Sequence, residues 1–184
     1  DTLNIVYSHT ETEFMRSTTS SFFKVDSATV GWSRLVTPNL SAQVGGGGVM
    51  VSTGLTTYMA NAALVMNFTN NSATVSYARS VVPSFVGTGA PLISDRLSLS
   101  AFQMLNRQWQ LSESVSYVHA SRAGGLNAQT FNSFAAGGDI QYWVNSIWAT
   151  SLSYNYTKFI SEFGSASTNF ERHVIMLSVV ASWG

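Results

Sequence analysis

Four short polar breaks divide the chain at near-regular intervals, and this repeat constrains the fold more than any other feature. The breaks are Thr37-Pro38-Asn39, Thr69-Asn70-Asn71, Asn106-Arg107-Gln108 and Val144-Asn145-Ser146. Between them lie pairs of alternating segments, separated by longer polar stretches at residues 52–58, 86–95, 121–132 and 161–168. This plan predicts five hairpins, with short turns at one end of the fold and longer loops at the other.

The segments between the breaks alternate with a period of two residues, which is typical of β-strands. In residues 148–156, for example, a tryptophan, a leucine and two tyrosines share one face, whereas alanine, serine and asparagine share the other. Each segment has about the ten residues that a tilted strand needs to cross a bilayer. We therefore predict an all-β, antiparallel up-and-down fold of about ten strands, in one domain covering residues 1–184.

The charge content indicates where such a fold would reside. Charged residues make up only 10% of the chain, with nine acidic and nine basic side chains, which is low for a surface covered by water. No run of apolar residues is long enough for a spanning helix, so a membrane protein with this sequence has to be a β-barrel. We predict a transmembrane β-barrel in the bacterial outer membrane, either closed or part of a larger barrel. Nucleic acid is not an expected partner, because the chain has no basic stripe.

Two further properties agree with export. The chain has no cysteine, which is compatible with passage through an oxidising periplasm. Its first residues do not form a signal peptide, so we expect any such segment to have been removed or to lie outside this chain.

Aromatic residues recur at both ends of the predicted strands. Ascending strands end in a tyrosine followed two residues later by a cation or a histidine, except in the second, where Gly45 to Gly48 replace the tyrosine. A second aromatic series lies at the turn end. Two such rings are the girdles of a membrane barrel. The predicted girdle residues are Tyr7, Tyr77, Tyr117, Tyr156, Trp32, Phe68, Trp109, Tyr142, Trp148 and Trp183.

Four residues just beyond the outer tyrosines are candidates for contact with lipid headgroups. They are His9, Arg79, His119 and Lys158. Cations at this height can pair with the phosphates of outer-membrane lipid and lipopolysaccharide. The alternative is ordinary snorkelling of long side chains to the interface.

The face opposite the aromatic residues is predicted to line the lumen. Its residues are Ser41, Gln43, Thr74, Ser76, Ser98, Ser100, Ser112, Ser114, Ser116, Asp139, Gln141, Ser151, Ser153, Asn155 and Arg172. This lining is small and hydroxylated, which favours a wet lumen. It has no ring of like charge and no coordination cluster, so we expect weak selectivity and no metal or cofactor. Alternatively, the hydroxyl groups only satisfy one another across strands.

Two features break the repeat and point to a protein partner on the outer face of the barrel. The alternation directs the carboxylate of Glu113 toward lipid, where a charge is costly. Gly45, Gly46, Gly47 and Gly48 could let another backbone approach closely or could mark a bend in the wall.

Enzymatic function is not expected. The three histidines are not accompanied by a nucleophile-elbow motif, a paired-histidine metal motif or a phosphate-binding loop.

The strand and turn pattern resembles a known group of proteins. Residues 28–42 (ATVGWSRLVTPNLSA), Leu97-Ser98-Leu99-Ser100 and residues 111–117 (LSESVSY) are similar to the β-barrel porins found beside exopolysaccharide and sorting systems of Gram-negative bacteria. The likeness covers most of residues 20–184. It implies a porin-like passage or a channel associated with polymer export. The alternatives are a non-conducting barrel that anchors a surface assembly, and a soluble surface β-domain for adhesion, such as a β-sandwich.

Overall fold

The computed structural model describes residues 1–16, 19–83, 91–122, 129–163 and 166–181. Within these residues the chain forms ten β-strands, from 12 to 19 residues long, and no helix long and apolar enough to cross a membrane. The strands are β1 (Thr2–Arg16), β2 (Thr19–Thr37), β3 (Leu40–Val51), β4 (Thr56–Asn67), β5 (Asn71–Pro83), β6 (Pro91–Met104), β7 (Trp109–Arg122), β8 (Gln129–Trp143), β9 (Trp148–Phe163) and β10 (Ala166–Ala181). The all-β class and the ten strands are confirmed, although the strands are longer than predicted.

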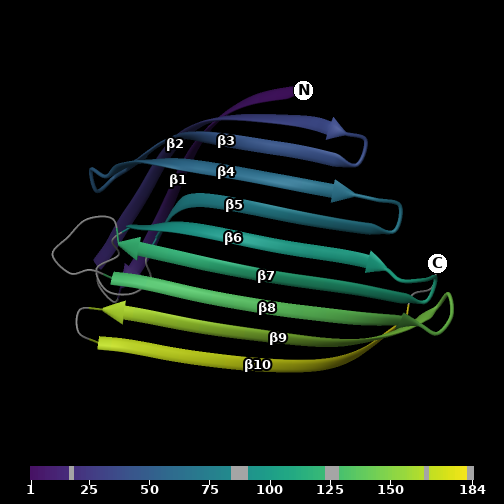
Figure 1. Cartoon of the computed structure of the whole chain (residues 1–184). Coiled ribbons are helices and arrows are strands. Elements are labelled where there is room, and N and C mark those ends of the chain that lie inside the picture. The colour runs from purple at the N-terminus through teal and green to yellow at the C-terminus, as the bar shows by residue number, and fades with distance from the viewer. Residues whose placement is uncertain (17–18, 84–90, 123–128, 164–165, 182–184) are drawn as a thin grey trace.

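The strands form one sheet in sequence order, and each is antiparallel to its neighbours. Residues 38–39, 68–70, 105–108 and 144–147 make the short turns at the right-hand edge of Figure 1, where the four polar breaks predicted them. Two of these turns are held by asparagine. The side chain of Asn106 accepts hydrogen bonds from the backbone of Gln108 and Trp109, and Asn145 does the same for Ile147 and Trp148. Such side-chain turns reverse a chain locally, which is why the breaks were readable from sequence.

At the opposite end the predicted loops are shorter than expected. Strand β6 begins at Pro91 and β7 continues to Arg122, so both strands extend into stretches that the sequence marked as loop. The strict alternation of long and short connections is therefore only partly observed.

The sheet curls but is open in this structure. Figure 1 shows β1 and β2 passing behind the later strands. Strands β1 and β10 form the two edges, and no pairing joins them among the described residues. The beginning of β1 and the end of β10 lie at the same end of the sheet as the four short turns, because an even number of antiparallel strands separates the two positions.

The cross-strand rows are staggered. The row that begins at Leu3, near the start of β1, passes through Trp32, Val44, Ala62, Tyr77, Leu97, Tyr117, Phe134 and Lys158 to Glu171, ten residues before the end of β10 at Ala181. From one strand to the next, the residue that belongs to this row thus lies about one residue further from the short turns. A rise of about 3.3 Å against a strand spacing of about 4.8 Å corresponds to a tilt of about 35°. Closed barrels have tilts of about 35–45°.

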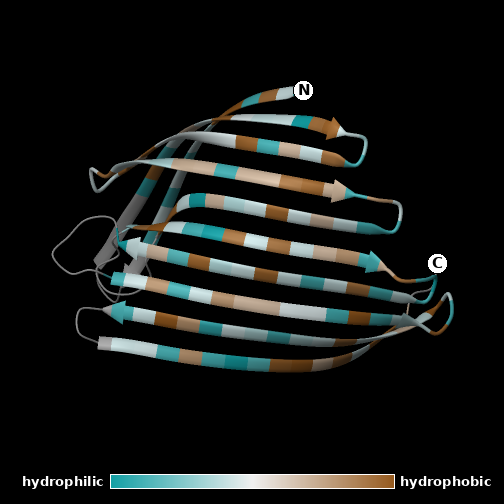
Figure 2. Ribbon diagram, in the orientation of Figure 1, coloured by the Kyte–Doolittle hydropathy of each residue, from teal (hydrophilic) through white to brown (hydrophobic). Residues whose placement is uncertain are grey.

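The two faces of the sheet differ in chemistry. Figure 2 shows brown and teal bands alternating along many of the strands. We call the face that carries Leu3, Tyr77 and Leu97 the apolar face, and the opposite face, which carries Ser76 and Ser98, the polar face. Large side chains on the apolar face are strongly exposed: Leu97 is 53% exposed in the middle of the sheet and Ile5 76% at its edge.

The polar face is the concave side of the curl. All but one of the buried residues that the structure describes belong to this face: Val49, Val51, Leu92, Ala120, Gln129, Ala149 and Ser153. Near the connection between β3 and β4 this face is not polar, because Val49 and Val51 pack with Val25, Leu55 and Met59 in a small hydrophobic cluster. The concave side therefore has a hydroxyl-rich middle and an apolar patch at the end opposite the short turns.

Candidate functional site

All fifteen residues predicted to line a lumen lie on the polar face. One cross-strand row contains Gln43, Ser76, Ser98, Ser116 and Arg172, and the next contains Ser41, Thr74, Ser100, Ser114 and Asn155. Rows closer to the short turns hold the remaining members: Ser112, Asp139, Gln141, Ser151 and Ser153. The register thus brings together a continuous strip of small polar side chains across β3 to β10.

This strip contains a shallow pocket of about 340 Å³, lined among others by Thr74, Ser100, Ser112, Asp139 and Ser153. The hydroxyl oxygen of Ser153 is buried in the pocket wall and has no hydrogen-bond partner. Elsewhere in the strip the hydroxyls of Ser76 and Ser98 do bond each other, at 2.7 Å. Mutual satisfaction of hydroxyl groups therefore accounts for only part of the strip.

Glycines keep the polar face thin. Gly31, Gly45 and Gly137 stand directly opposite Asn4, Asn61 and Asn155 on the neighbouring strands. A Cβ atom on any of the three would collide with the amide oxygen of its asparagine. Each asparagine side chain consequently lies flat over a glycine and does not stand out from the sheet. Together with the serines, this arrangement leaves free space above the concave surface.

Sequence reasoning missed two arginines on this face. Arg96 lies in β6, two residues before Ser98, and Arg122 lies in β7, opposite Leu92 of β6. The alternation of the sequence was sufficient to find Arg96, because the period of two that places Ser98 and Ser100 on this face also places Arg96 there.

The aromatic residues predicted as girdles fall mainly on the apolar face. Tyr7, Tyr77, Tyr117, Tyr156, Trp32, Trp109, Tyr142 and Trp148 share that face by register. The rings of Trp109 and Tyr142 are in contact, with centroids 4.6 Å apart. Phe68 lies in the turn after β4, and Trp183 lies outside the described residues. Tyr58 and Tyr154 are additional members of this face that the sequence repeat did not single out.

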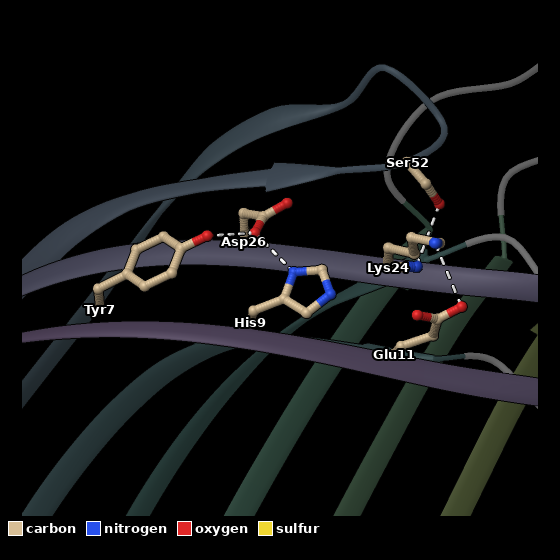
Figure 3. A network of polar contacts seen from close by, with 6 residues as sticks. All are labelled: Tyr7, His9, Glu11, Lys24, Asp26 and Ser52. Atoms are coloured by element: carbon tan, nitrogen blue, oxygen red, sulfur yellow. Dashed lines mark hydrogen bonds and ion pairs between the residues drawn. The ribbon is translucent and has the colours of Figure 1, made fainter.

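Beyond the outer tyrosines the apolar face carries a repeated side-chain cluster. In the first hairpin, the Tyr7 hydroxyl donates a hydrogen bond of 2.7 Å to Asp26, and Nδ1 of His9 lies 2.8 Å from the same carboxylate oxygen. Figure 3 shows this cluster and, next to it, the ion pair between Lys24 and Glu11, whose charged atoms are 3.2 Å apart. Tyrosine and histidine come from β1, and their shared acceptor comes from β2.

The same cluster recurs at the hairpin of β5 and β6. Tyr77 donates to Asp95 at 2.6 Å, and Arg79 donates to both oxygens of that carboxylate at 3.0 and 2.9 Å. The guanidinium also lies over the ring of Tyr58, 4.5 Å from its centroid. Tyr58 stands opposite Gly48, so the strand whose tyrosine is replaced by glycine receives an aromatic ring from its partner strand.

Two more hairpins carry related clusters. At β7 and β8, Tyr117 and His119 lie 2.9 and 2.8 Å from the side-chain oxygen of Asn132. At β9 and β10, Lys158 forms an ion pair of 2.7 Å with Glu171, and Tyr154 lies 2.9 Å from His173. All four predicted headgroup residues therefore already have a partner on the neighbouring strand, and the charge of Arg79 and Lys158 is balanced by a carboxylate. This pairing favours a structural role over capture of lipid phosphate.

The two features that suggested a protein partner do not lie together. Glu113 is on the apolar face of β7 between two small residues, Ala101 and Gly138. The glycine run is in β3, four strands away, which corresponds to about 19 Å across the sheet. The run is also divided between the faces. A Cβ on Gly47 would collide with the backbone of Ala28 and Thr29, so the close approach predicted for this run occurs within the sheet itself.

No group of three histidine, aspartate or glutamate side chains able to hold a metal ion occurs among the described residues. The site is therefore best described as two surfaces, one apolar with a rim of paired charges and one concave and hydroxylated.

The shielded position of the Arg79 cluster gives a testable prediction. Removing the carboxylate with Asp95→Ala leaves the guanidinium, whose side chain is only 20% exposed, without its counterion. We expect the free energy of unfolding to fall by about 1–3 kcal/mol, because a shielded donor loses its acceptor. The matched control is Asp26→Ala in the exposed first cluster, where water replaces the carboxylate and the change should be much smaller. Urea unfolding of the folded protein measures both, and equal losses would contradict the prediction.

Comparison with known proteins adds no relationship: no family model matches the chain, and no curated protein sequence matches it.

Proposed function

We propose that this chain forms a transmembrane β-barrel in the bacterial outer membrane and provides a porin-like passage. The observation that carries the proposal is the opposite chemistry of the two faces. An exposed apolar face on the convex side, bounded by aromatic residues and paired charges, suits lipid. A concave face of small hydroxylated side chains suits a water-filled lumen.

Closure of the sheet is part of this proposal. The side chains that are most exposed on the apolar face include Ile5 of β1 and Ile175 of β10, at 76% and 74%. They are exposed because neither edge strand has a neighbour on its outer side. An unpaired strand edge is not tolerated in lipid, where no water can satisfy its backbone groups. The tilt of about 35° derived from the stagger is that of a closed barrel, so we propose that β1 pairs with β10.

The resemblance to porins of exopolysaccharide and sorting systems remains a prediction, as does a role in polymer export. The proposal assigns no catalytic activity and no cofactor. Outer-membrane lipid is the proposed surrounding of the apolar face, and a protein contact near Glu113 is retained as a hypothesis.

The second candidate is a non-conducting barrel that anchors a surface assembly. The hydrophobic cluster of Val49 and Val51 on the concave side favours it, because an apolar constriction can close a narrow passage by excluding water.

Conductance measurement separates the two candidates. The refolded protein should first show the heat-modifiable gel migration and detergent partitioning of a membrane barrel, and absence of both would indicate a soluble surface β-domain. In planar bilayers a passage gives discrete conductance steps. A protein that is folded and inserted but gives no steps would contradict the passage and support the anchor.

A further inference from the structure

The register separates the charges of this neutral chain between the two faces. Seven of the nine acidic residues occupy strand positions on the apolar face: Glu11, Glu13, Asp26, Asp95, Glu113, Glu162 and Glu171. An eighth, Asp1, lies 3.6 Å from Arg34 of that face. Asp139 is the one acidic residue on the polar face. The neutral total therefore conceals an uneven distribution.

Basic side chains on the apolar face are largely neutralised there. Lys24, Arg34, Arg79 and Lys158 each form an ion pair with a carboxylate of the same face. The polar face carries Arg96, Arg122 and Arg172. Among the side chains that the structure describes, three arginines stand against one aspartate on this face, which is an excess of two positive charges.

Two of these arginines, Arg96 and Arg172, are exposed and lie at nearly equal distances from the end of the sheet that carries the short turns. Arg96 lies eight residues from the turn end of β6 at Met104, and Arg172 lies nine residues from the end of β10 at Ala181. Both side chains are exposed, and neither forms an ion pair with a carboxylate of the described residues. In a closed ten-strand barrel, β6 and β10 are four steps apart and so lie on nearly opposite walls.

We propose that Arg96 and Arg172 face each other across the lumen and make the passage selective for small anions. This inference rests on the proposed function, and it replaces the weak selectivity predicted from the lumen lining in the sequence. Positive side chains on low-dielectric walls focus their field into a narrow lumen and raise the local concentration of anions. Rings of arginine or lysine are the usual basis of anion selectivity in pores.

Reversal potentials in a potassium chloride gradient test the proposal. We expect chloride to permeate about three-fold or more above potassium, because the lumen attracts counterions. The double variant Arg96→Gln/Arg172→Gln should abolish or reverse this preference, and Asp139→Asn should increase it. Arg34→Gln is the matched control, because it removes one arginine from the opposite face and should leave the ratio unchanged.

A second readout does not depend on conductance. The chain has no cysteine, so Ser98→Cys introduces a single thiol on the polar face, two residues from Arg96. An anionic thiosulfonate reagent should label this thiol faster than a cationic reagent of the same size, and the preference should disappear in the Arg96→Gln background. Leu97→Cys on the apolar face is the control and should show no such dependence.

The possible results are distinguishable. Conductance steps with a cation preference, or a chloride preference that survives the double variant, would overturn the anion filter while leaving the passage in place. A silent barrel whose Ser98→Cys thiol shows no reagent preference would overturn both.

Discussion

Leu99→Arg is expected to destabilise the inserted protein more than any other single substitution considered. Leu99 lies on the apolar face of β6 between Val75 and Val115, and it is 48% exposed. If this face contacts the hydrocarbon core, an arginine here costs about 2–4 kcal/mol. Folding into lipid vesicles over a urea gradient measures the loss as a shift of the unfolding midpoint.

The next residue supplies the control. Ser100→Arg places the same side chain one residue further along β6, on the polar face. It should leave the unfolding midpoint nearly unchanged, since the guanidinium would lie in water, and it should reduce the conductance of the passage instead. Equal destabilisation by both variants would show that the two faces do not have the different surroundings we propose.

A disulfide across the open edge is the second expected result, and it tests closure directly. Continuing the stagger of about one residue per strand from β10 to β1 places Glu171 opposite Glu13, and hence Val179 opposite Ile5. Directly opposed residues of antiparallel strands have Cβ atoms about 4.5–5.5 Å apart, close to the range that a disulfide requires. Mild oxidation of the variant Ile5→Cys/Val179→Cys should therefore give a nearly complete intramolecular crosslink on a non-reducing gel.

The register makes the control specific. In Ile5→Cys/Ile175→Cys the second cysteine keeps the same face but is displaced by four residues, which is about 13 Å along the strand. This variant should remain reduced. If the first variant instead formed disulfide-linked dimers, the wall would be completed by a second copy of the chain. No crosslink in either variant would contradict pairing between β1 and β10.

Much of the fold was predictable because its signals are local. The turns around Asn106 and Asn145 are formed by side chains that bond backbone groups two or three residues away, so the sequence identifies them without knowledge of the rest of the chain. The same holds for the assignment of Ser98 and Leu99 to opposite faces, which follows from strand geometry alone. The strand ends were less predictable, because pairing with a neighbour carried β7 beyond the point where the polar loop was expected to begin.

The candidate site was predictable only in part, because its clusters join residues far apart in the chain. The spacing of Tyr77 and Arg79 was visible in the sequence, but their common acceptor Asp95 is set by the register of β5 against β6. The spacing alone predicts either contact of the cations with lipid phosphate or ordinary snorkelling to the interface. The role of Gly47 was hidden for the same reason, since the backbone it accommodates belongs to β2.

The sequence by itself determined that this chain makes ten alternating strands, where its short turns fall and which residues share a face, because a period of two and a side-chain turn are both local properties. Only the tertiary structure decided which charges neutralise each other and which arginines are left on the concave side. Those outcomes depend on strand register and on the curvature of the sheet. Both arise from pairing between strands and are not properties of any one segment.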